Sequence, residues 1–416
     1  MPNKKSFRRN FSYMFASRLV FAASQWLLLV VIARLTTPHD LGLFTYSVAL
    51  ISPILLVTQL NMRAFMATDS NDEFTFADYL ATRIFGIGLA LLLIGGIALI
   101  SGRELAAIAM LLLIASYKAT ESLSDVFNGV LQRNEHMAPI ARAVSARGVT
   151  AVICMLLALQ LTGSVLIGVG CILAAWILIL IAHDYPVSRG QLQGPLFVPN
   201  PKVWRVIRAC YPLGITLGLM SLRINIPVYI IEAHMGIEEV GYYSAIAYFL
   251  VAGNIITGSL LQTAAPRLAR IYRDRDTGQF SRFLSLLVLV GGIIGLAGLL
   301  LAATFGHWIL ATMYGLAYAA HTDVLVWIMI AAVIGNLSQF MGLSLTVSRL
   351  FRFHLLSQCL GVIVVAVLSW ILVPSQGMIG GAMALAAATT VTFLCNLVVT
   401  RARVIPSIRS QGNRML

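Results

Sequence analysis

Twelve long apolar runs constrain the fold of this chain more than any other feature of its sequence. A helix rises about 1.5 Å per residue, so about 20 apolar residues cross the hydrocarbon layer of a membrane, and each run is long enough. The first run follows a basic N-terminus and reaches Leu35, which is too long for a cleaved signal peptide and predicts a retained helix. The others cover residues 41–62, 79–101, 105–131, 140–162, 164–183, 210–234, 240–265, 282–305, 322–347, 353–373 and 378–400. The sequence therefore predicts an all-α integral membrane protein with twelve transmembrane helices in two six-helix bundles.

The composition excludes an ordinary soluble globular protein, because only 11% of the 416 residues are charged and 59% are hydrophobic. A formal charge of +13 could indicate nucleic-acid binding, but no basic run is interleaved with stacking aromatic residues. The basic residues lie instead in short segments between the apolar runs. Five cysteines without a C-x-x-C spacing and seven scattered histidines indicate neither a disulfide framework nor a metal site, so no metal or cofactor is expected.

The basic residues also predict the orientation of the helices, because the cytoplasmic loops of a membrane protein hold most of its positive charge. With the N-terminus inside, the outer loops keep only Arg34 and Arg103. The membrane keeps Arg18, Lys118 and Arg223, and the inner segments hold the remaining 24 of the 29 lysines and arginines. A register shifted by one helix destroys this asymmetry. Both termini are therefore predicted to be cytoplasmic.

A segment rich in proline and glycine, residues 185–203, divides the chain almost at its middle. Its composition predicts a cytoplasmic linker rather than another helix. The predicted organisation is an N-terminal bundle of residues 1–184, a C-terminal bundle of residues 204–400 and a basic cytoplasmic tail of residues 401–416. Two bundles that both start from the cytoplasm are repeats of the same orientation, with the substrate path between them.

A polar stripe interrupts the fourth apolar run. Its five residues follow one another at spacings of three, four, three and four, which place them on one face of a helix: Lys118, Glu121, Asp125, Asn128 and Gln132. Lys118 lies about 20 Å into the run, beyond the middle of the membrane, where a charge cannot face lipid. Two interpretations stay open. The stripe is either a structural ion network of Lys118, Glu121 and Asp125, or part of a polar translocation path.

Further polar residues lie within other apolar runs and are candidates for substrate binding. Arg223, near the middle of the seventh run, would bring a cation to the substrate, with Asn225 two residues on. Arg18 lies only about 10 Å deep, so its side chain could equally reach the cytoplasmic headgroups. Gln25 and Asn336 could instead form hydrogen bonds between helices.

The chain lacks the G-x-x-x-x-G-K-[ST] loop that binds nucleotide phosphates, so transport would draw on an ion gradient or on the gradient of the substrate. Glu121 and Asp125 are the candidates for ion coupling. Lys118 is three residues from Glu121 and is expected to pair with it and keep it ionised. Asp125 has Asn128, and no cation, one turn further on, which makes it the better candidate.

Four short marks recur in a fixed order along the chain. Residues 41–44 (Leu-Gly-Leu-Phe) open the second run and residues 240–243 (Val-Gly-Tyr-Tyr) open the eighth, each after an acidic turn. Residues 265–268 (Ala-Pro-Arg-Leu) end the eighth run, and residues 313–320 precede the tenth. With the length, the twelve runs and the two halves, these marks resemble the multidrug/oligosaccharidyl-lipid/polysaccharide (MOP) exporter superfamily, and within it the polysaccharide and O-antigen flippases.

The resemblance implies a flippase that moves an undecaprenyl-diphosphate-linked sugar repeat from the cytoplasmic to the periplasmic leaflet of a bacterial inner membrane by alternating access. The implied partners are the lipid-linked oligosaccharide and membrane lipids, with a polysaccharide polymerase and chain-length or export proteins as candidate protein partners. Nucleic acid is not expected. A polar, partly cationic cavity suits the anionic head of such a substrate.

Two other functions remain open from the sequence. An ion-coupled drug efflux transporter of the same superfamily would favour an acidic pocket, whereas three cations lie within the predicted membrane spans. A membrane enzyme acting on lipid-linked sugars would need a large loop with catalytic acids or bases, and the longest gaps between runs are short. The sequence therefore predicts a transporter rather than an enzyme.

Overall fold

The computed structural model describes residues 4–68, 73–190, 195–198, 201–406 and 408. Within these residues the regular structure is helical and includes no strand. The chain divides into two compact units, unit 1 (residues 1–221) and unit 2 (residues 222–416), and the division falls inside helix α9, Val203–Met235. The predicted bundles of residues 1–184 and 204–400 stay a prediction. Much of the predicted tail, residues 407 and 409–416, lies outside the described residues.

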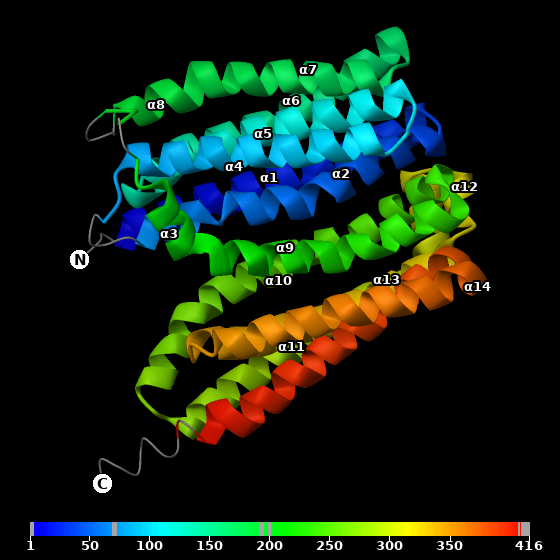
Figure 1. Ribbon diagram of the computed structural model, residues 1–416. Coiled ribbons are helices and arrows are strands. Elements are labelled where there is room, and N and C mark those ends of the chain that lie inside the picture. The colour runs from blue at the N-terminus through cyan, green and yellow to red at the C-terminus, as the bar shows by residue number, and fades with distance from the viewer. Residues whose placement is uncertain (1–3, 69–72, 191–194, 199–200, 407, 409–416) are drawn as a thin grey trace. The chain divides into compact units, whose positions relative to one another are not determined.

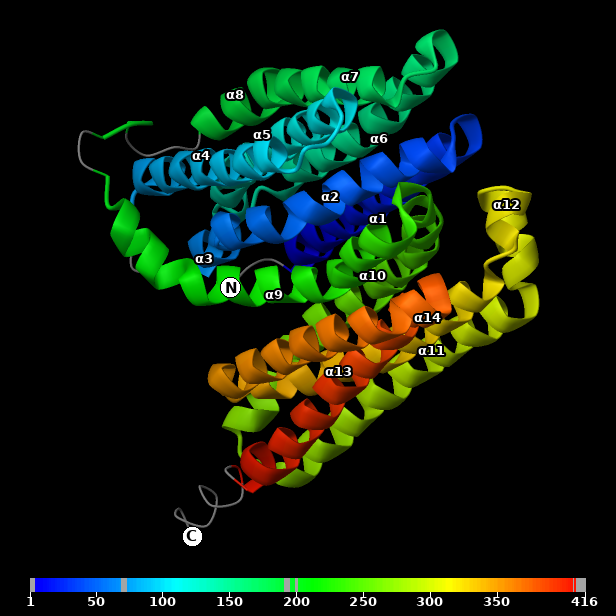
Figure 2. The ribbon, with the colours of Figure 1, turned by 45° about the vertical axis from the view of Figure 1, so that its right-hand side comes forward.

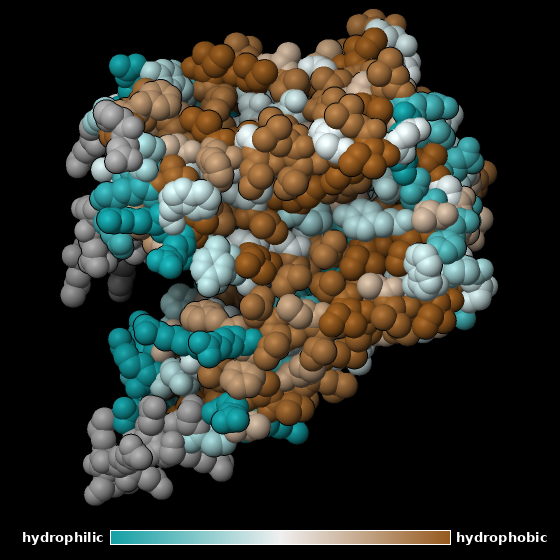
Figure 3. Space-filling model, viewed as in Figure 1, coloured by the Kyte–Doolittle hydropathy of each residue, from teal (hydrophilic) through white to brown (hydrophobic). Residues whose placement is uncertain are grey.

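Unit 1 is built from helices that lie side by side (Figure 1). Before α9 they are α1 (Lys4–Leu35), α2 (Pro38–Gln59), α3 (Met62–Thr68), α4 (Phe76–Ile100), α5 (Leu105–Arg133), α6 (Met137–Thr162), α7 (Val165–Ile179), the π-helical segment η1 (Leu180–Asp184) and α8 (Tyr185–Arg189). Helix α6 packs on α1 and α7, and α5 packs on α4 and α7. Apolar side chains cover the middle of the visible face, and hydrophilic ones gather near the helix ends, as in a membrane protein (Figure 3).

Two helices of unit 1 begin with the same capping motif. The hydroxyls of Thr37 and Thr75 accept hydrogen bonds from the backbone N–H groups of Asp40 and Asp78, and each carboxylate accepts one from the backbone of its threonine. These capping boxes start α2 and α4. Asp78 also accepts the backbone N–H of Lys202 at 2.7 Å, which ties the segment before α9 to α4.

Unit 2 contains the rest of α9 and the remaining helices. They are α10 (Ile237–Arg273), α11 (Thr277–Met313), α12 (Leu316–Ala319), α13 (Thr322–Val347), α14 (Phe351–Val399) and the π-helical segment η2 (Thr400–Val404). Helix α13 packs on α10, α11 and α14. Helix α14 is broken at Gly377 (φ 61°), and its two parts run back along each other (Figure 2). This φ favours glycine, and a Cβ at Gly380 would collide with the carbonyl oxygen of Leu372, so the reversal depends on small residues.

The described helices agree with the twelve predicted spans. Ten of them are long and apolar enough to cross a membrane. The last of these, Phe351–Val404, includes the break at Gly377 and therefore covers the two predicted spans at 353–373 and 378–400. Helix α10 covers the predicted span at 240–265. The all-α membrane fold is thus confirmed.

Three sequence expectations need correction. Arg83 and Arg147 were expected in inner segments, but they lie within α4 and α6 and are buried. Their positions add two cations to those predicted within the spans. The linker predicted from residue 185 begins later, because the helix continues through α8 as far as Arg189. Residues 191–194 and 199–200 of the predicted linker lie outside the described residues.

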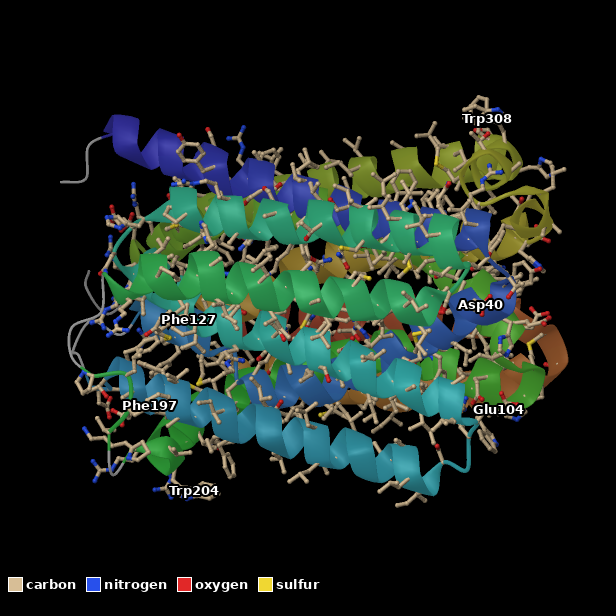
Figure 4. The ribbon with its side chains drawn as sticks, turned by 90° about the horizontal axis from the view of Figure 1, so that it is seen from above. Asp40, Glu104, Phe127, Phe197, Trp204 and Trp308 are labelled. Atoms are coloured by element: carbon tan, nitrogen blue, oxygen red, sulfur yellow. The ribbon has the colours of Figure 1, made fainter. Side chains whose placement is uncertain are left out.

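The segments predicted on the outer and on the inner side of the membrane lie at opposite ends of the unit 1 helices. Figure 4 shows Asp40 and Glu104 at one end, and Phe197 and Trp204 near the other. Phe197 and Trp204 are 68% and 73% exposed, as aromatic residues at a membrane surface are. The alternation of the loops is therefore consistent with the predicted crossings, whereas the side that faces the cytoplasm stays a prediction.

Candidate functional site

The polar stripe of α5 divides into two separate ion networks. Lys118 Nζ donates to Glu121 Oε2 at 2.9 Å, as its three-residue spacing predicts. The same ammonium lies 5.4 Å and 5.9 Å from the ring centroids of Tyr117 and Trp176. These contacts satisfy a cation within a membrane span, where an unpaired charge is costly. The Lys118 and Glu121 charges therefore neutralise each other.

Asp125 belongs to the second network and has partners on other helices. Arg63 Nη1 lies 2.9 Å from Asp125 Oδ1, and Arg83 Nη2 lies 3.9 Å from Asp125 Oδ2. Arg63 Nε also donates to Gln132 Oε1 at 2.7 Å. The sequence places no cation one turn from Asp125 on its own helix, and its cationic partners come instead from α3 and α4. The role of Asp125 in ion coupling stays a prediction. The lack of a cation one turn away, which favoured Asp125 over Glu121, no longer supports it.

A break between α2 and α3 brings Arg63 to this carboxylate. Leu60 and Asn61 have positive φ angles of 57° and 48°, which end α2 and redirect the chain. The short α3 then packs closely on α5, because a Cβ at Gly129 would lie 2.9 Å from Met66 Sδ. An apolar cluster holds this arrangement; it comprises Leu60, Met62, Met66, Phe74, Tyr79, Val126, Val130, Val206 and Cys210.

Arg83 reaches the same site from α4. Its side chain is only 1% exposed, and its Nη1 donates to Ser122 Oγ at 3.0 Å. Arg83 Nε, Arg83 Nη2 and Arg63 Nη2 are buried and have no hydrogen-bond acceptor among the described residues. An unmade buried hydrogen bond costs about 1–3 kcal/mol, and more for a charged group. Acceptor oxygens of a ligand would satisfy these donors.

The charges of this cluster do not balance. Arg18, exposed on α1, interacts electrostatically with Arg63 and Asp125. Two guanidinium groups, of Arg63 and Arg83, lie within 4.0 Å of the Asp125 carboxylate, and with Arg18 the cluster has an excess of two positive charges (three minus one). We call these four residues the cationic cluster. Guanidinium groups bind carboxylate and phosphate oxygens through paired hydrogen bonds, so the cluster suits an anion.

A third network in unit 1 is balanced and buried. Arg147 Nη2 donates to Asp184 Oδ2 and to Ser124 Oγ, which joins α6, η1 and α5. The Arg147 and Asp184 side chains are 3% and 1% exposed. His183 Nδ1 lies 3.1 Å from the other Asp184 oxygen. We assign this pair to the packing of the helices, because its charges neutralise each other.

Arg223 is the cation of unit 2 that the sequence singled out. Its Nη1 donates to Thr392 Oγ1 at 3.1 Å, and its buried Nε has no acceptor among the described residues. The side chain lies over Gly361, where a Cβ would be 3.2 Å from Arg223 Cδ. No described carboxylate lies within 4.0 Å of its guanidinium. Arg223 is thus a cation on a membrane helix for which the described residues supply no counter-ion.

Of the remaining predicted residues, one forms a contact between helices, and the other two have no role that the structure assigns. Asn336 is buried on α13, and its Oδ1 accepts a hydrogen bond from Thr257 Oγ1 of α10 at 3.3 Å. This contact matches the helix-to-helix hydrogen bond that the sequence left open for it. Gln25 and Asn225 are half-buried on α1 and α9. Their role in substrate binding stays a prediction.

The fold is found in solved membrane transporters. An inward-facing multidrug resistance MATE family transporter of the MOP superfamily superposes with a TM-score of 0.72 at 12% sequence identity, over 96% of each chain. The lipid II flippase MurJ, in an inward closed conformation, gives a TM-score of 0.72 at 12% identity, over 96% of this chain and 89% of MurJ. These similarities define the class: an all-α, multi-pass membrane protein with the MOP transporter fold.

Sequence comparison assigns the family. The model of a family described as polysaccharide biosynthesis protein matches residues 7–272. The chain therefore belongs to this polysaccharide biosynthesis protein family. It is also similar to the capsular polysaccharide biosynthesis protein CapF of Staphylococcus aureus, with 22% identity over 377 residues, which are 90% of this chain and 94% of that protein. The resemblance inferred from the sequence is thus confirmed.

Proposed function

We propose that this protein is a flippase for lipid-linked oligosaccharides. It moves an undecaprenyl-diphosphate-linked repeat unit from the cytoplasmic to the periplasmic leaflet of a bacterial inner membrane, for the assembly of O-antigen, capsule or exopolysaccharide. The observation that carries the proposal is the cationic cluster, in which Arg63 and Arg83 contact the Asp125 carboxylate and keep unpartnered N–H donors, while Arg18 adds a third positive charge.

The chemistry of a diphosphate diester matches the cluster. Each of its phosphates carries one negative charge, so that the pair compensates the excess of two positive charges. Phosphate oxygens only accept hydrogen bonds, and the unpartnered atoms of Arg63 and Arg83 only donate them. A cationic drug would meet repulsion here, which argues against an efflux transporter for cations.

The relatives support the same substrate class. The names of CapF and of the family concern polysaccharide biosynthesis, and MurJ is described as a flippase of lipid II. A protein that changes the leaflet of such a compound makes and breaks no covalent bond. We therefore propose a transporter and not an enzyme, with both termini in the cytoplasm and alternating access of the site to the two leaflets.

A flipping assay in proteoliposomes tests the proposal. Purified protein is reconstituted with a fluorescent undecaprenyl-diphosphate oligosaccharide, and a membrane-impermeant reagent measures the fraction in the outer leaflet. Wild-type protein should accelerate the exchange between leaflets and leave the compound chemically intact. The Arg63→Gln/Arg83→Gln double variant serves as the matched control and should exchange it slowly. Chemical conversion of the lipid would indicate an enzyme, and export of a cationic dye without lipid exchange would indicate an efflux transporter.

A further inference from the structure

Two neutral side chains of α5 hold the guanidinium groups of the cationic cluster. Arg63 Nε donates to Gln132 Oε1 at 2.7 Å, and Arg83 Nη1 donates to Ser122 Oγ at 3.0 Å. Gln132 ends the polar stripe that the sequence singled out, and Ser122 is buried on the same helix. Neither side chain carries a charge, so neither attracts an anion by itself. What each of them can determine is the orientation of the guanidinium that it binds.

The contacts of Arg63 fix two of the three nitrogen atoms of its guanidinium. Nη1 lies 2.9 Å from Asp125 Oδ1, and Nε is bound by Gln132, seven residues further along α5. Residues seven apart lie on the same face of a helix, so both acceptors approach Arg63 from one side. Because a guanidinium is planar and rigid, two fixed nitrogens determine the place of the third. The third is Nη2, which is buried without an acceptor among the described residues.

The guanidinium of Arg83 depends on Ser122 for its orientation. Its Nη2 lies 3.9 Å from Asp125 Oδ2, which is an ion pair beyond hydrogen-bonding distance. The hydrogen bond that directs the group is the one from Nη1 to the hydroxyl of Ser122, three residues before Asp125 on α5. Arg83 Nε and Nη2 are buried and have no acceptor within the described part of the chain. The guanidinium groups of Arg63 and Arg83 thus lie beside the two oxygens of one carboxylate, each with unpartnered donors.

Two neighbouring guanidinium groups distinguish a ligand with two phosphates from a ligand with one. A diphosphate can engage both groups at once, whereas a monophosphate satisfies itself with either of them. Ordering a long side chain on binding costs entropy, and this cost is avoided where the side chain is already held in place. A diphosphate gains from the prior ordering of both groups, and a monophosphate gains from the ordering of one.

We propose that Gln132 and Ser122 are positioning residues, which act through Arg63 and Arg83 and make the cluster selective for a diphosphate over a monophosphate. The inference rests on the proposed function, since the lipid-linked diphosphate is taken from there. If one guanidinium is no longer held, a diphosphate must order it on binding. A monophosphate uses the other guanidinium instead and loses little.

Two probes that differ by one phosphate measure this selectivity. They are farnesyl-diphosphate N-acetylglucosamine and farnesyl-phosphate N-acetylglucosamine, which share the lipid and the sugar. Calorimetric titration of the purified protein gives both affinities, and their ratio is the readout. Wild-type protein should bind the diphosphate at least about tenfold more tightly, because the second phosphate adds hydrogen bonds to a charged group. A smaller folded fraction weakens both probes by the same factor and leaves the ratio unchanged.

Neutral substitutions on α5 test the two positioning residues without a change in the charge of the cluster. Gln132→Met keeps the length of the side chain and removes its amide, and Ser122→Ala removes the hydroxyl. Each should weaken the diphosphate probe about fivefold, the equivalent of about 1 kcal/mol, and the monophosphate probe less than about twofold. Ser122→Thr keeps a hydroxyl and should keep the wild-type ratio. Thr120→Val is the matched control and should keep both affinities, because the Thr120 hydroxyl donates within α5, to the carbonyl of Ser116 at 3.0 Å.

The double variant Gln132→Met/Ser122→Ala leaves neither guanidinium held, so it should weaken the monophosphate probe more than either single variant does. A wild-type ratio in both single variants overturns the inference, as does equal affinity of the wild type for the two probes. A loss of selectivity in Ser122→Ala that Ser122→Thr shares also overturns it. These three results leave the proposed function intact, because the diphosphate probe still binds. If the wild type does not bind the diphosphate probe at all, the proposed function fails and the selectivity fails with it.

Discussion

Arg63 Nη1 of the short helix α3 lies 2.9 Å from Asp125 Oδ1 of α5, so the carboxylate of the polar stripe is neutralised from outside its own helix. This ion pair changes what the stripe can do. The Asp125 carboxylate contacts two guanidinium groups, and three of their nitrogen atoms stay buried without a hydrogen-bond acceptor among the described residues. The site is therefore assembled from segments that are distant in the sequence.

Removal of one guanidinium should weaken anion binding. Arg63→Gln deletes a charge and its donors, and hydrogen bonds to charged groups contribute about 1.5–3 kcal/mol each, or about tenfold to a hundredfold in affinity. The affinity of Arg63→Lys should lie between those of the wild type and of Arg63→Gln, because an ammonium keeps the charge but cannot form paired hydrogen bonds with a phosphate. The measurement is calorimetric binding of farnesyl-diphosphate N-acetylglucosamine. Arg403→Gln is the control, since it also deletes one guanidinium, from η2 of unit 2, where Arg403 stacks on Phe353 with 5.9 Å to the ring centroid. Equal affinities for wild type and Arg63→Gln would remove the cluster from the binding site.

Asp125→Asn should have the opposite effect on affinity. The substitution keeps the size of the side chain and removes the only carboxylate of the cationic cluster, which frees both guanidinium groups. We expect tighter binding of the same probe and slower lipid exchange in proteoliposomes, because a more cationic site releases its anion less readily. The role in ion coupling predicted from the sequence requires a different outcome. In that case the affinity stays unchanged and the response to an imposed proton or sodium gradient disappears.

The buried pair of Arg147 and Asp184 should affect stability rather than binding. Asp184→Asn leaves the Arg147 charge buried without a counter-ion, and breaking such a pair costs about 3–5 kcal/mol. The double variant Arg147→Met/Asp184→Leu buries no charge and should recover most of the loss. Thermal unfolding of the purified proteins in detergent measures both. A double variant no more stable than Asp184→Asn would show that the network does more than neutralise charge.

The predicted orientation can be measured by labelling. In a background without cysteine, Asp40→Cys should react with a membrane-impermeant maleimide added outside intact cells, because its loop is predicted to be periplasmic. Arg273→Cys should react only after the cells are opened. Labelling of both positions from the same side is incompatible with the twelve-helix topology.

The fold could be predicted because its signals are local. Hydrophobic runs fix the spans, and the three-residue spacing of Lys118 and Glu121 places their charges side by side on one helix. Arg63 is different, because it precedes Asp125 by 62 residues and reaches it only through the turn at Leu60 and Asn61. Short turns with positive φ have no signal in hydropathy. The cationic cluster could therefore not be assembled from the sequence.

The sequence does contain a local signal for the position of Arg83 within its helix. Thr75 and Asp78 have the spacing of a capping box, which starts α4 at Phe76 and places Arg83 about two turns into the helix. The apolar run alone begins later and leaves Arg83 near the predicted inner end. Its partners on α5 belong to tertiary packing, as do those of Arg147 on η1, so burial of these two side chains follows only from the structure.

The close approach of α3 to α5 provides the last prediction, because it positions Arg63 without contributing any charge. A Cβ at Gly129 would lie 2.9 Å from Met66 Sδ and 3.2 Å from Met66 Cε. Gly129→Ala should be tolerated, since the flexible end of a methionine can move. Gly129→Leu should push α3 away, at a cost of about 1–3 kcal/mol for overpacking, and carry Arg63 from Asp125.

Binding of the same probe should then fall about tenfold in Gly129→Leu, the equivalent of about 1.4 kcal/mol, although every charge of the cluster is still present. Met66→Ala, added to Gly129→Leu, makes room for the new side chain and should restore part of the affinity. This rescue distinguishes a displaced Arg63 from a general loss of structure, because a second cavity-forming substitution would only worsen misfolding. If Gly129→Leu binds the probe as the wild type does, the guanidinium of Arg63 does not depend on this packing to reach its place beside Asp125.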